Sequence, residues 1–135
     1  MRPFLVFVVA GISTAQAPGA FQPVASTMDL MRAMIIPAAD ALFAAGGEEP
    51  KTDEDWGKLR NQALILIESG NLLMMDGRAR DKDQWMKDAR LQMDAGQMAL
   101  KAILAKDLDK LVGDAGTAIV DSCESCHKHY MTRAK

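Results

Sequence analysis

The sequence predicts an all-α protein, folded as an antiparallel up-down-up-down four-helix bundle. Three observations lead to this prediction. Apolar residues recur at three- and four-residue spacing in four successive stretches, as expected for helices with one buried face. The connections between these stretches are short, which favours antiparallel neighbours. No stretch of useful length alternates apolar and polar residues as a half-buried strand does.

The chain begins with a segment typical of a secretory signal peptide. Met1-Arg2-Pro3 is a short basic start, Phe4–Ile12 is an apolar run, and small residues follow from Ser13 to Ala17. This order is that of a signal peptide, and the apolar run is too short to span a bilayer comfortably. We assign residues 1–17 to the signal, with cleavage after Ala15 or Ala17 as the alternatives. Residues 26–135 are assigned to one helical domain without a stable membrane anchor.

The first helix is expected from Thr27 to about Ala45. Ser26 or Thr27 can cap its N-terminus, where Asp29 stabilises the positive end of the helix dipole. Pro37 removes a backbone hydrogen bond and should kink this helix. The apolar face is formed by Met31, Met34, Ile35, Ala38, Ala41, Leu42 and Ala45.

After a linker at Gly46–Pro50, a second helix is expected from Thr52 or Asp53 to about Gly77, a residue suited to the C-terminal end of a helix. Asn71 interrupts its apolar face. The Asn71 amide is either exposed or locally hydrogen-bonded, or else it bonds to a neighbouring helix or a bound cofactor. The apolar face is formed by Trp56, Leu59, Ala63, Leu66, Ile67, Gly70, Leu73 and Met74.

The third helix is expected to begin near Asp81 or Asp83, and the fourth runs from about Asp107 to Tyr130. The apolar face of the third helix is formed by Trp85, Ala89, Leu91, Met93, Ala95, Met98, Ala102 and Ile103. That of the fourth is formed by Leu108, Leu111, Val112, Ala115, Ile119, Cys123, Cys126 and Tyr130.

The most informative motif, Cys123-Glu124-Ser125-Cys126-His127, lies on the fourth helix. Two thiols one helical turn apart share a face, and each can add to one vinyl group of a porphyrin. The next residue then offers an imidazole nitrogen to the iron. Cys-x-x-Cys-His is the attachment motif of c-type haem. The sequence therefore predicts one covalent haem c, held by Cys123 and Cys126, with His127 as an iron ligand.

A redox, zinc-binding or disulfide role for the two cysteines fits the sequence less well. A redox dithiol usually lies at the start of a helix that follows a strand, and a structural zinc site needs four ligands. A disulfide across this spacing would be strained inside a helix. His129 points away from the cysteine face and is expected to be exposed. The net charge of −2, without a basic run, argues against nucleic acid as a partner.

A secreted four-helix chain with Cys-x-x-Cys-His on its last helix resembles the cytochrome c′ and cytochrome c-556 family. The resemblance covers residues 27–130 and implies that Cys123 and Cys126 hold the haem and that His127 is the proximal ligand. It also implies that the distal face of the haem meets the first helix. The residue there is apolar in five-coordinate cytochrome c′ and Met in six-coordinate cytochrome c-556. Many cytochromes c′ carry a basic residue four places after the proximal histidine, where this chain has Met131.

Met28, Met31 and Met34 lie one turn apart on the first helix, on the side that the resemblance sets against the haem. Met31 is the first choice as a metal ligand, because it lies on the apolar stripe, beyond the first turn and away from Pro37. The alternative is that all three residues only pack against the porphyrin.

These expectations describe a periplasmic electron carrier rather than an enzyme. Covalent haem is normally attached outside the bacterial cytoplasm, which agrees with the signal peptide. We expect one-electron transfer with a redox partner protein. The sequence does not decide whether the protein is a monomer or a homodimer. The alternative is a five-coordinate protein of the cytochrome c′ type that binds NO or CO. A dithiol protein without haem is a third hypothesis.

Overall fold

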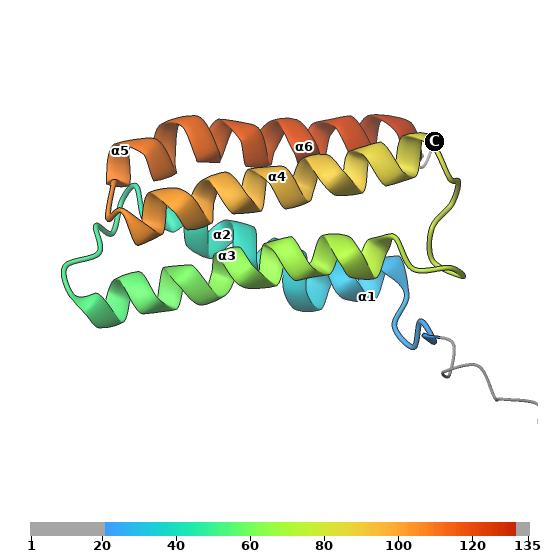
Figure 1. The fold of residues 1–135 in the computed structure, drawn as a ribbon, viewed down its shortest axis with the longest axis horizontal. Helices are drawn as coiled ribbons and strands as arrows, with labels where there is room; N and C mark the ends of the chain where they lie inside the picture. The colour runs from blue at the N-terminus through green and yellow to red at the C-terminus, as the bar shows by residue number, and fades with distance from the viewer. Residues whose placement is uncertain (1–20, 132–135) are drawn as a thin grey trace, which may run out of the picture.

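The computed structural model describes residues 21–131, in which four helical segments lie side by side (Figure 1). No strand occurs in this part of the chain. The predicted all-α class with four helices is therefore confirmed. The predicted signal peptide, residues 1–17, lies outside the described residues.

The first segment consists of α1 (Thr27–Leu30), a π-helical stretch η1 (Met31–Ile35) and α2 (Ile36–Ala44). Ser26 caps α1, since its Oγ accepts from the Asp29 N–H while the Asp29 carboxylate accepts from the Ser26 N–H. Pro37 lies in the first turn of α2. A π-helical stretch, η1, ends two residues before Pro37, and π-helical turns and prolines are both recognised places where helices bend.

The second and third segments are α3 (Asp53–Leu73) and α4 (Gln84–Leu104). Helix α3 ends earlier than the predicted end at Gly77, because side chains from outside the helix take its last carbonyl groups. The Trp85 indole N–H donates to the Leu73 carbonyl at 2.8 Å, and Arg78 donates to the Leu72 carbonyl. Gly77 instead lies in the connecting loop, with a positive φ of 84° that suits glycine.

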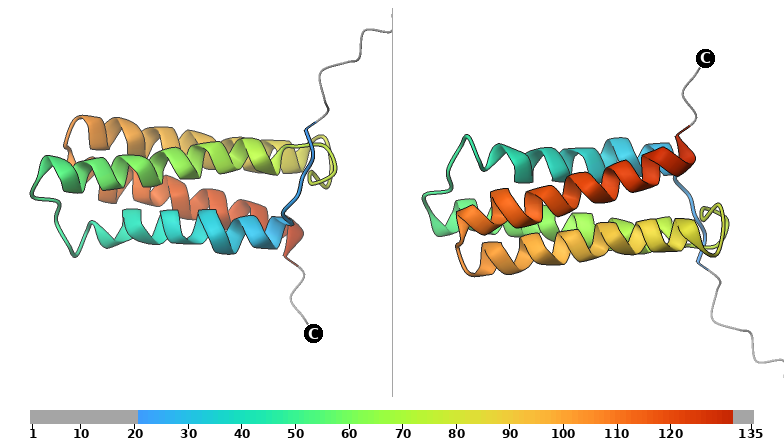
Figure 2. Two further views of the ribbon diagram at one scale, coloured as in Figure 1. Left: turned by 90° about the horizontal axis from the view of Figure 1, so that it is seen from below. Right: turned by 90° about the horizontal axis from the view of Figure 1, so that it is seen from above.

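The fourth segment consists of α5 (Leu108–Lys110), a second π-helical stretch η2 (Leu111–Ala115) and α6 (Gly116–Tyr130). Its extent agrees with the predicted helix. Helix α6 contacts α4, and α3 contacts both α4 and the first segment (Figure 2). Among the described residues, no helix is long and apolar enough to cross a membrane.

The core lies between the four segments, and the predicted apolar faces are largely buried in it. Three predicted members are wrong, because Val112, Leu91 and Met98 are exposed. On α4 the buried stripe follows strict three- and four-residue spacing and includes two polar side chains. Its members are Trp85, Asp88, Ala89, Gln92, Ala95, Gly96, Ala99, Ala102 and Ile103.

The buried polar groups are hydrogen-bonded. Gln92 donates from Nε2 to the Leu66 carbonyl at 3.0 Å and to Ser69 Oγ at 2.9 Å, which joins α4 to α3. Asn71 is exposed and bonds locally to Glu68 at 3.2 Å, which confirms the first of the two interpretations of its amide. The Asn71 amide is therefore not part of the core.

Candidate functional site

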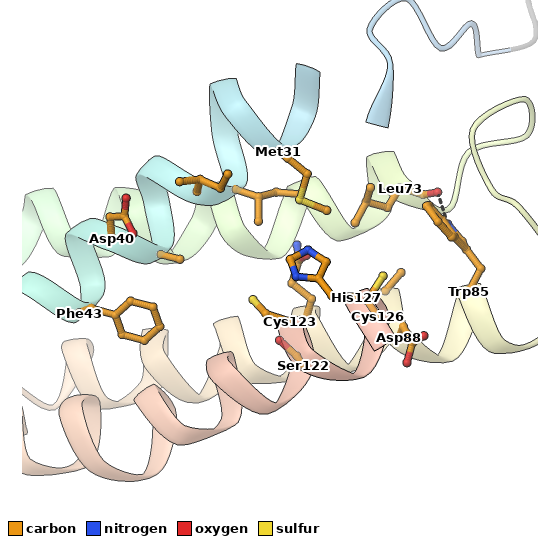
Figure 3. A pocket seen from close by; sticks show the side chains of 15 residues that line it. Met31, Asp40, Phe43, Leu73, Trp85, Asp88, Ser122, Cys123, Cys126 and His127 are labelled. Carbon is orange, nitrogen blue, oxygen red and sulfur yellow. Dashed lines mark hydrogen bonds between the residues drawn. The ribbon is translucent and has the colours of Figure 1, made fainter. Parts of the chain in front are cut away.

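A cavity of about 180 Å³ lies between the first helical segment and α6 (Figure 3). Most of its wall is apolar. Cys123, Cys126 and His127 of the predicted attachment motif all line it from α6. The remaining wall residues are Met31, Ile35, Ile36, Ala39, Asp40, Phe43, Leu73, Trp85, Asp88, Ala89, Gln92 and Ser122.

Helix α6 directs the motif into the cavity because of its buried stripe. Ala115 and Ile119 are buried, and Cys123 and Cys126 continue the same spacing toward the C-terminus. Both thiols are free and half-buried. The imidazole of His127, one residue further round the helix, projects toward the first segment (Figure 3).

Met31 lies across the cavity from His127, on the first segment (Figure 3). Met31 is the first residue of η1, so the π-helical turn begins at a residue that lines the cavity. Such turns are frequent at functional sites. Met34 packs against the core and does not line this cavity, and Met28 is 53% exposed. Of the three candidate methionines, Met31 therefore shares this cavity with the motif, whereas Met28 lines only the adjoining cavity, together with Cys126 and His127.

A second cavity, of about 150 Å³, adjoins the first near the end of α6. Met31, Trp85, Cys126 and His127 line both cavities. The two spaces therefore meet around His127 and Met31. Tyr130, which lines the second cavity, packs edge-on against Trp85 with ring centroids 4.9 Å apart.

The surroundings of the thiols argue against a redox dithiol. Burial raises the pKa of Cys126 to about 11, and the nearby Asp88 carboxylate adds to this effect. Burial also raises the pKa of Cys123. Reactive cysteines instead have lowered pKa values, commonly at helix N-termini, whereas these thiols lie well inside α6. The zinc alternative also gains no support, since residues 21–131 contain no group of three or more His, Cys, Asp or Glu that could hold a metal ion.

The residues present fit covalent haem better. Two free thiols one turn apart, an adjacent imidazole and a thioether on the opposite wall are the donor set of a His/Met c-type haem. The apolar wall suits a macrocycle, because burying apolar surface stabilises the complex. The thiols also need not be ionised in the free protein for this role.

Asp88 is the main residue of the site that sequence reasoning missed. It is 1% exposed, lines the cavity and lies on the buried stripe of α4. Its position three residues after Trp85 places Asp88 on the buried face of α4, but a prediction from apolar spacing includes only apolar residues in that face. Ser122 and Gln92, also polar and buried, were missed for the same reason.

No protein-family model, curated protein or solved structure matches this chain.

Proposed function

We propose that this protein is a periplasmic c-type cytochrome that carries one covalent haem and transfers single electrons. The observation that carries the proposal is the placement of Cys123, Cys126 and His127 on one wall of an apolar cavity, with Met31 on the opposite wall. The contacts of α3 with the first segment and with α4, and of α4 with α6, are consistent with an antiparallel up-down-up-down bundle. A bundle of this kind with this motif on its last helix is what the cytochrome c′ and cytochrome c-556 family resemblance implies.

In this proposal each side chain of the site has a separate task. The thiols of Cys123 and Cys126 form the two covalent links, and the imidazole of His127 ligates the iron. The bound haem supplies the Fe(III)/Fe(II) couple. Met31, from the first segment, would supply a second ligand to the iron. Trp85, which is 3% exposed, and its apolar neighbours keep water from the wall.

These tasks describe transfer of an electron rather than conversion of a substrate. Both proposed ligands persist in either oxidation state, and a Met ligand raises the reduction potential. His127 is exposed at the surface of α6, where a redox partner protein can approach the site. We therefore propose an electron carrier and not an enzyme.

One observation favours a second candidate, the binding of NO or CO at a five-coordinate iron. Beyond Met31 the cavity continues along the first segment past Ile35, Ala39 and Phe43. If Met31 were not a ligand, these apolar side chains would form the wall of a site for a small diatomic ligand.

The test is to purify the protein from the periplasmic fraction and examine its haem before and after denaturation. We expect the wild-type haem to stay with the denatured chain, and visible and near-infrared spectra to show a low-spin iron with a Met ligand. The variant C123A/C126A should lose its haem in denaturant. Thr117→Ala, an exposed change on the same helix, is the matched control and should retain it. A wild-type protein without haem would contradict the proposal.

A further inference from the structure

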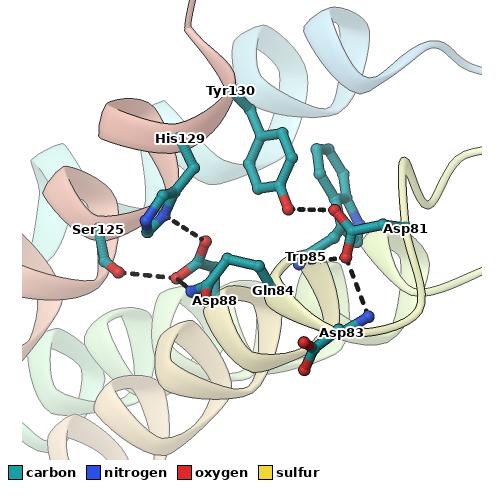
Figure 4. A network of polar contacts seen from close by, with 8 residues as sticks. All are labelled: Asp81, Asp83, Gln84, Trp85, Asp88, Ser125, His129 and Tyr130. Carbon is teal, nitrogen blue, oxygen red and sulfur yellow. Dashed lines mark hydrogen bonds and ion pairs between the residues drawn. The ribbon is translucent and has the colours of Figure 1, made fainter.

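The carboxylate of Asp88 is almost completely buried between α4 and α6 (Figure 4). Its Oδ1 accepts hydrogen bonds from Ser125 Oγ at 2.7 Å and from Gln84 Nε2 at 3.0 Å. Its Oδ2 lies 3.2 Å from Nδ1 of His129. Gln84 belongs to α4 itself, so two of the three contacts join α4 to α6.

Of the two α6 residues bound by Asp88, one lies inside the motif and the other just after it. Ser125 lies between Cys123 and Cys126, and His129 lies two residues after His127. Ser125 and His129 are four residues apart and therefore occupy one face of the helix. Holding this face against α4 leaves the neighbouring face, with the cysteines and His127, directed toward the first segment.

A rotation of α6 about its axis would undo this arrangement. Adjacent residues on a helix are about 100° apart, so a rotation by one residue would turn a thiol or the imidazole out of the cavity. Near the motif, Ser122 is small and bonds to the Ile119 carbonyl of its own helix. Beyond the motif, Tyr130 holds the end of α6 through its ring contact with Trp85 and its hydrogen bond to Asp81. Asp88 is the group whose hydrogen bonds reach α6 within the motif itself, at Ser125.

A buried carboxylate is a costly way to join two helices. Removing a charge from water costs several kcal/mol, which hydrogen bonds and an opposite charge only partly offset. An apolar residue at this position would pack without that cost. Directional bonds, unlike apolar contacts, define a single orientation, which is the best-supported role of buried polar groups in helical assemblies.

We propose that Asp88 is a positioning residue that fixes the rotation of α6 and thereby directs Cys123, Cys126 and His127 into the cavity. The assignment of what these three residues hold rests on the proposed function. The positioning of α6 itself does not.

The test compares Asp88→Ala and Asp88→Asn with Asp94→Asn, which removes an exposed charge from the same helix. The first readout is amide hydrogen exchange of full-length protein in the segment 120–131. In Asp88→Ala this segment should exchange about tenfold faster, while α3 changes little, because two of the three lost bonds are made to α6 and none to α3. Asp88→Asn should recover part of the protection, since its amide oxygen can still accept from Ser125.

The second readout is specific for the role of the motif. In the holoprotein, Asp88→Ala should alter the reduction potential and the paramagnetically shifted NMR signals of the His127 ring, and Asp88→Asn should alter them less. A core residue without a positioning role would lower the stability of all helices alike and leave these signals unchanged. That result would overturn the proposal, as would equal exchange in Asp88→Ala and Asp94→Asn.

The two hypotheses fail in different ways. If the wild-type protein lacks haem, the proposed function is wrong, and hydrogen exchange still decides whether Asp88 orients α6. If haem is present but neither readout responds in Asp88→Asn or Asp88→Ala, the cytochrome proposal stands and the positioning role is wrong. Should Asp88→Ala fail to fold, Asp88→Asn decides both readouts.

Discussion

Gly96 of α4 lies so close to Ile67 of α3 that a Cβ on Gly96 would be 2.7 Å from Ile67 Cγ1. Real Cβ atoms do not approach other atoms so closely, so Gly96→Ala must displace the Ile67 side chain or move the two helices apart. We expect a loss of about 1–3 kcal/mol in the free energy of unfolding, the usual cost of overpacking a core. Urea denaturation of the purified protein measures it.

Gly57 is the matched control, because it lies in the same pair of helices but a Cβ there would meet no atom within 4 Å. Gly57→Ala should raise the free energy of unfolding by about 0.5–1 kcal/mol, since alanine favours helix over glycine. The close packing of α3 and α4 would be refuted if both variants were stabilised.

The start of α3 depends on a capping box between Thr52 and Asp55. Thr52 Oγ1 accepts from the Asp55 N–H at 3.1 Å, and the Asp55 carboxylate accepts from the Thr52 N–H at 3.0 Å. Thr52→Ala should cost about 1 kcal/mol in the free energy of unfolding, because a helix N–H is left without its partner. Thr117→Ala, at an exposed position within the fourth helical segment, removes the same hydroxyl without a cap and should not destabilise the protein. Equal urea midpoints for the two variants would contradict the cap.

Tyr130, the only tyrosine of the chain, donates a hydrogen bond to the Asp81 carboxylate. Partial burial and this bond raise the pKa of Tyr130 to about 12. The same bond lowers the pKa of Asp81, and a hydrogen bond from the backbone N–H of Trp85 lowers it further. Stability from the raised pKa of Tyr130 is complete below about pH 10 and is lost as the pH rises toward 12. Stability from Asp81 is complete above about pH 4 and is lost as the pH falls through its lowered pKa.

Tyr130→Phe should therefore lower the urea midpoint most between these limits, and the difference from wild type should shrink at about pH 3 and about pH 12. The variant keeps the ring against Trp85 and removes only the hydroxyl, so packing is held constant. Absorbance of the tyrosinate gives an independent check, because a folded-state transition near pH 10, the ordinary value for tyrosine, would contradict the bond to Asp81.

The helices and the shared placement of the three motif residues on one helix could be predicted because both depend on local spacing. Apolar residues every three or four positions define each helix, and Cys123, Cys126 and His127 lie within one short run of consecutive residues. The end of α3 could not be predicted in this way. It depends on Arg78 and Trp85, which reach back from outside the helix to the carbonyl groups of its last turn.

The polar side of the site was also beyond what apolar spacing can predict. Asp88 is buried because Ser125 and His129, 37 and 41 residues later, provide its hydrogen bonds. Sequence spacing within α4 gives its place on the stripe but not these partners. His129 itself is exposed as expected, yet the role of its contact with Asp88 emerges only when α6 is packed against α4.

Met31 decides between the two proposed haem functions. Its side chain lies on the cavity wall across from His127, so a thioether bond to iron would make the iron low-spin and fill the position that a gas needs. Met31→Ala should then open this position, lower the reduction potential and let CO bind quickly to the reduced protein. Met34→Ala, at a half-buried core position, should cost on the order of a few kcal/mol in stability without changing the spin state. Met28→Ala, at an exposed position, should change little. Visible spectra and mixing with CO measure these effects. An unmutated protein that is high-spin and binds CO readily would show that Met31 is not a ligand. That result would favour gas binding over electron transfer.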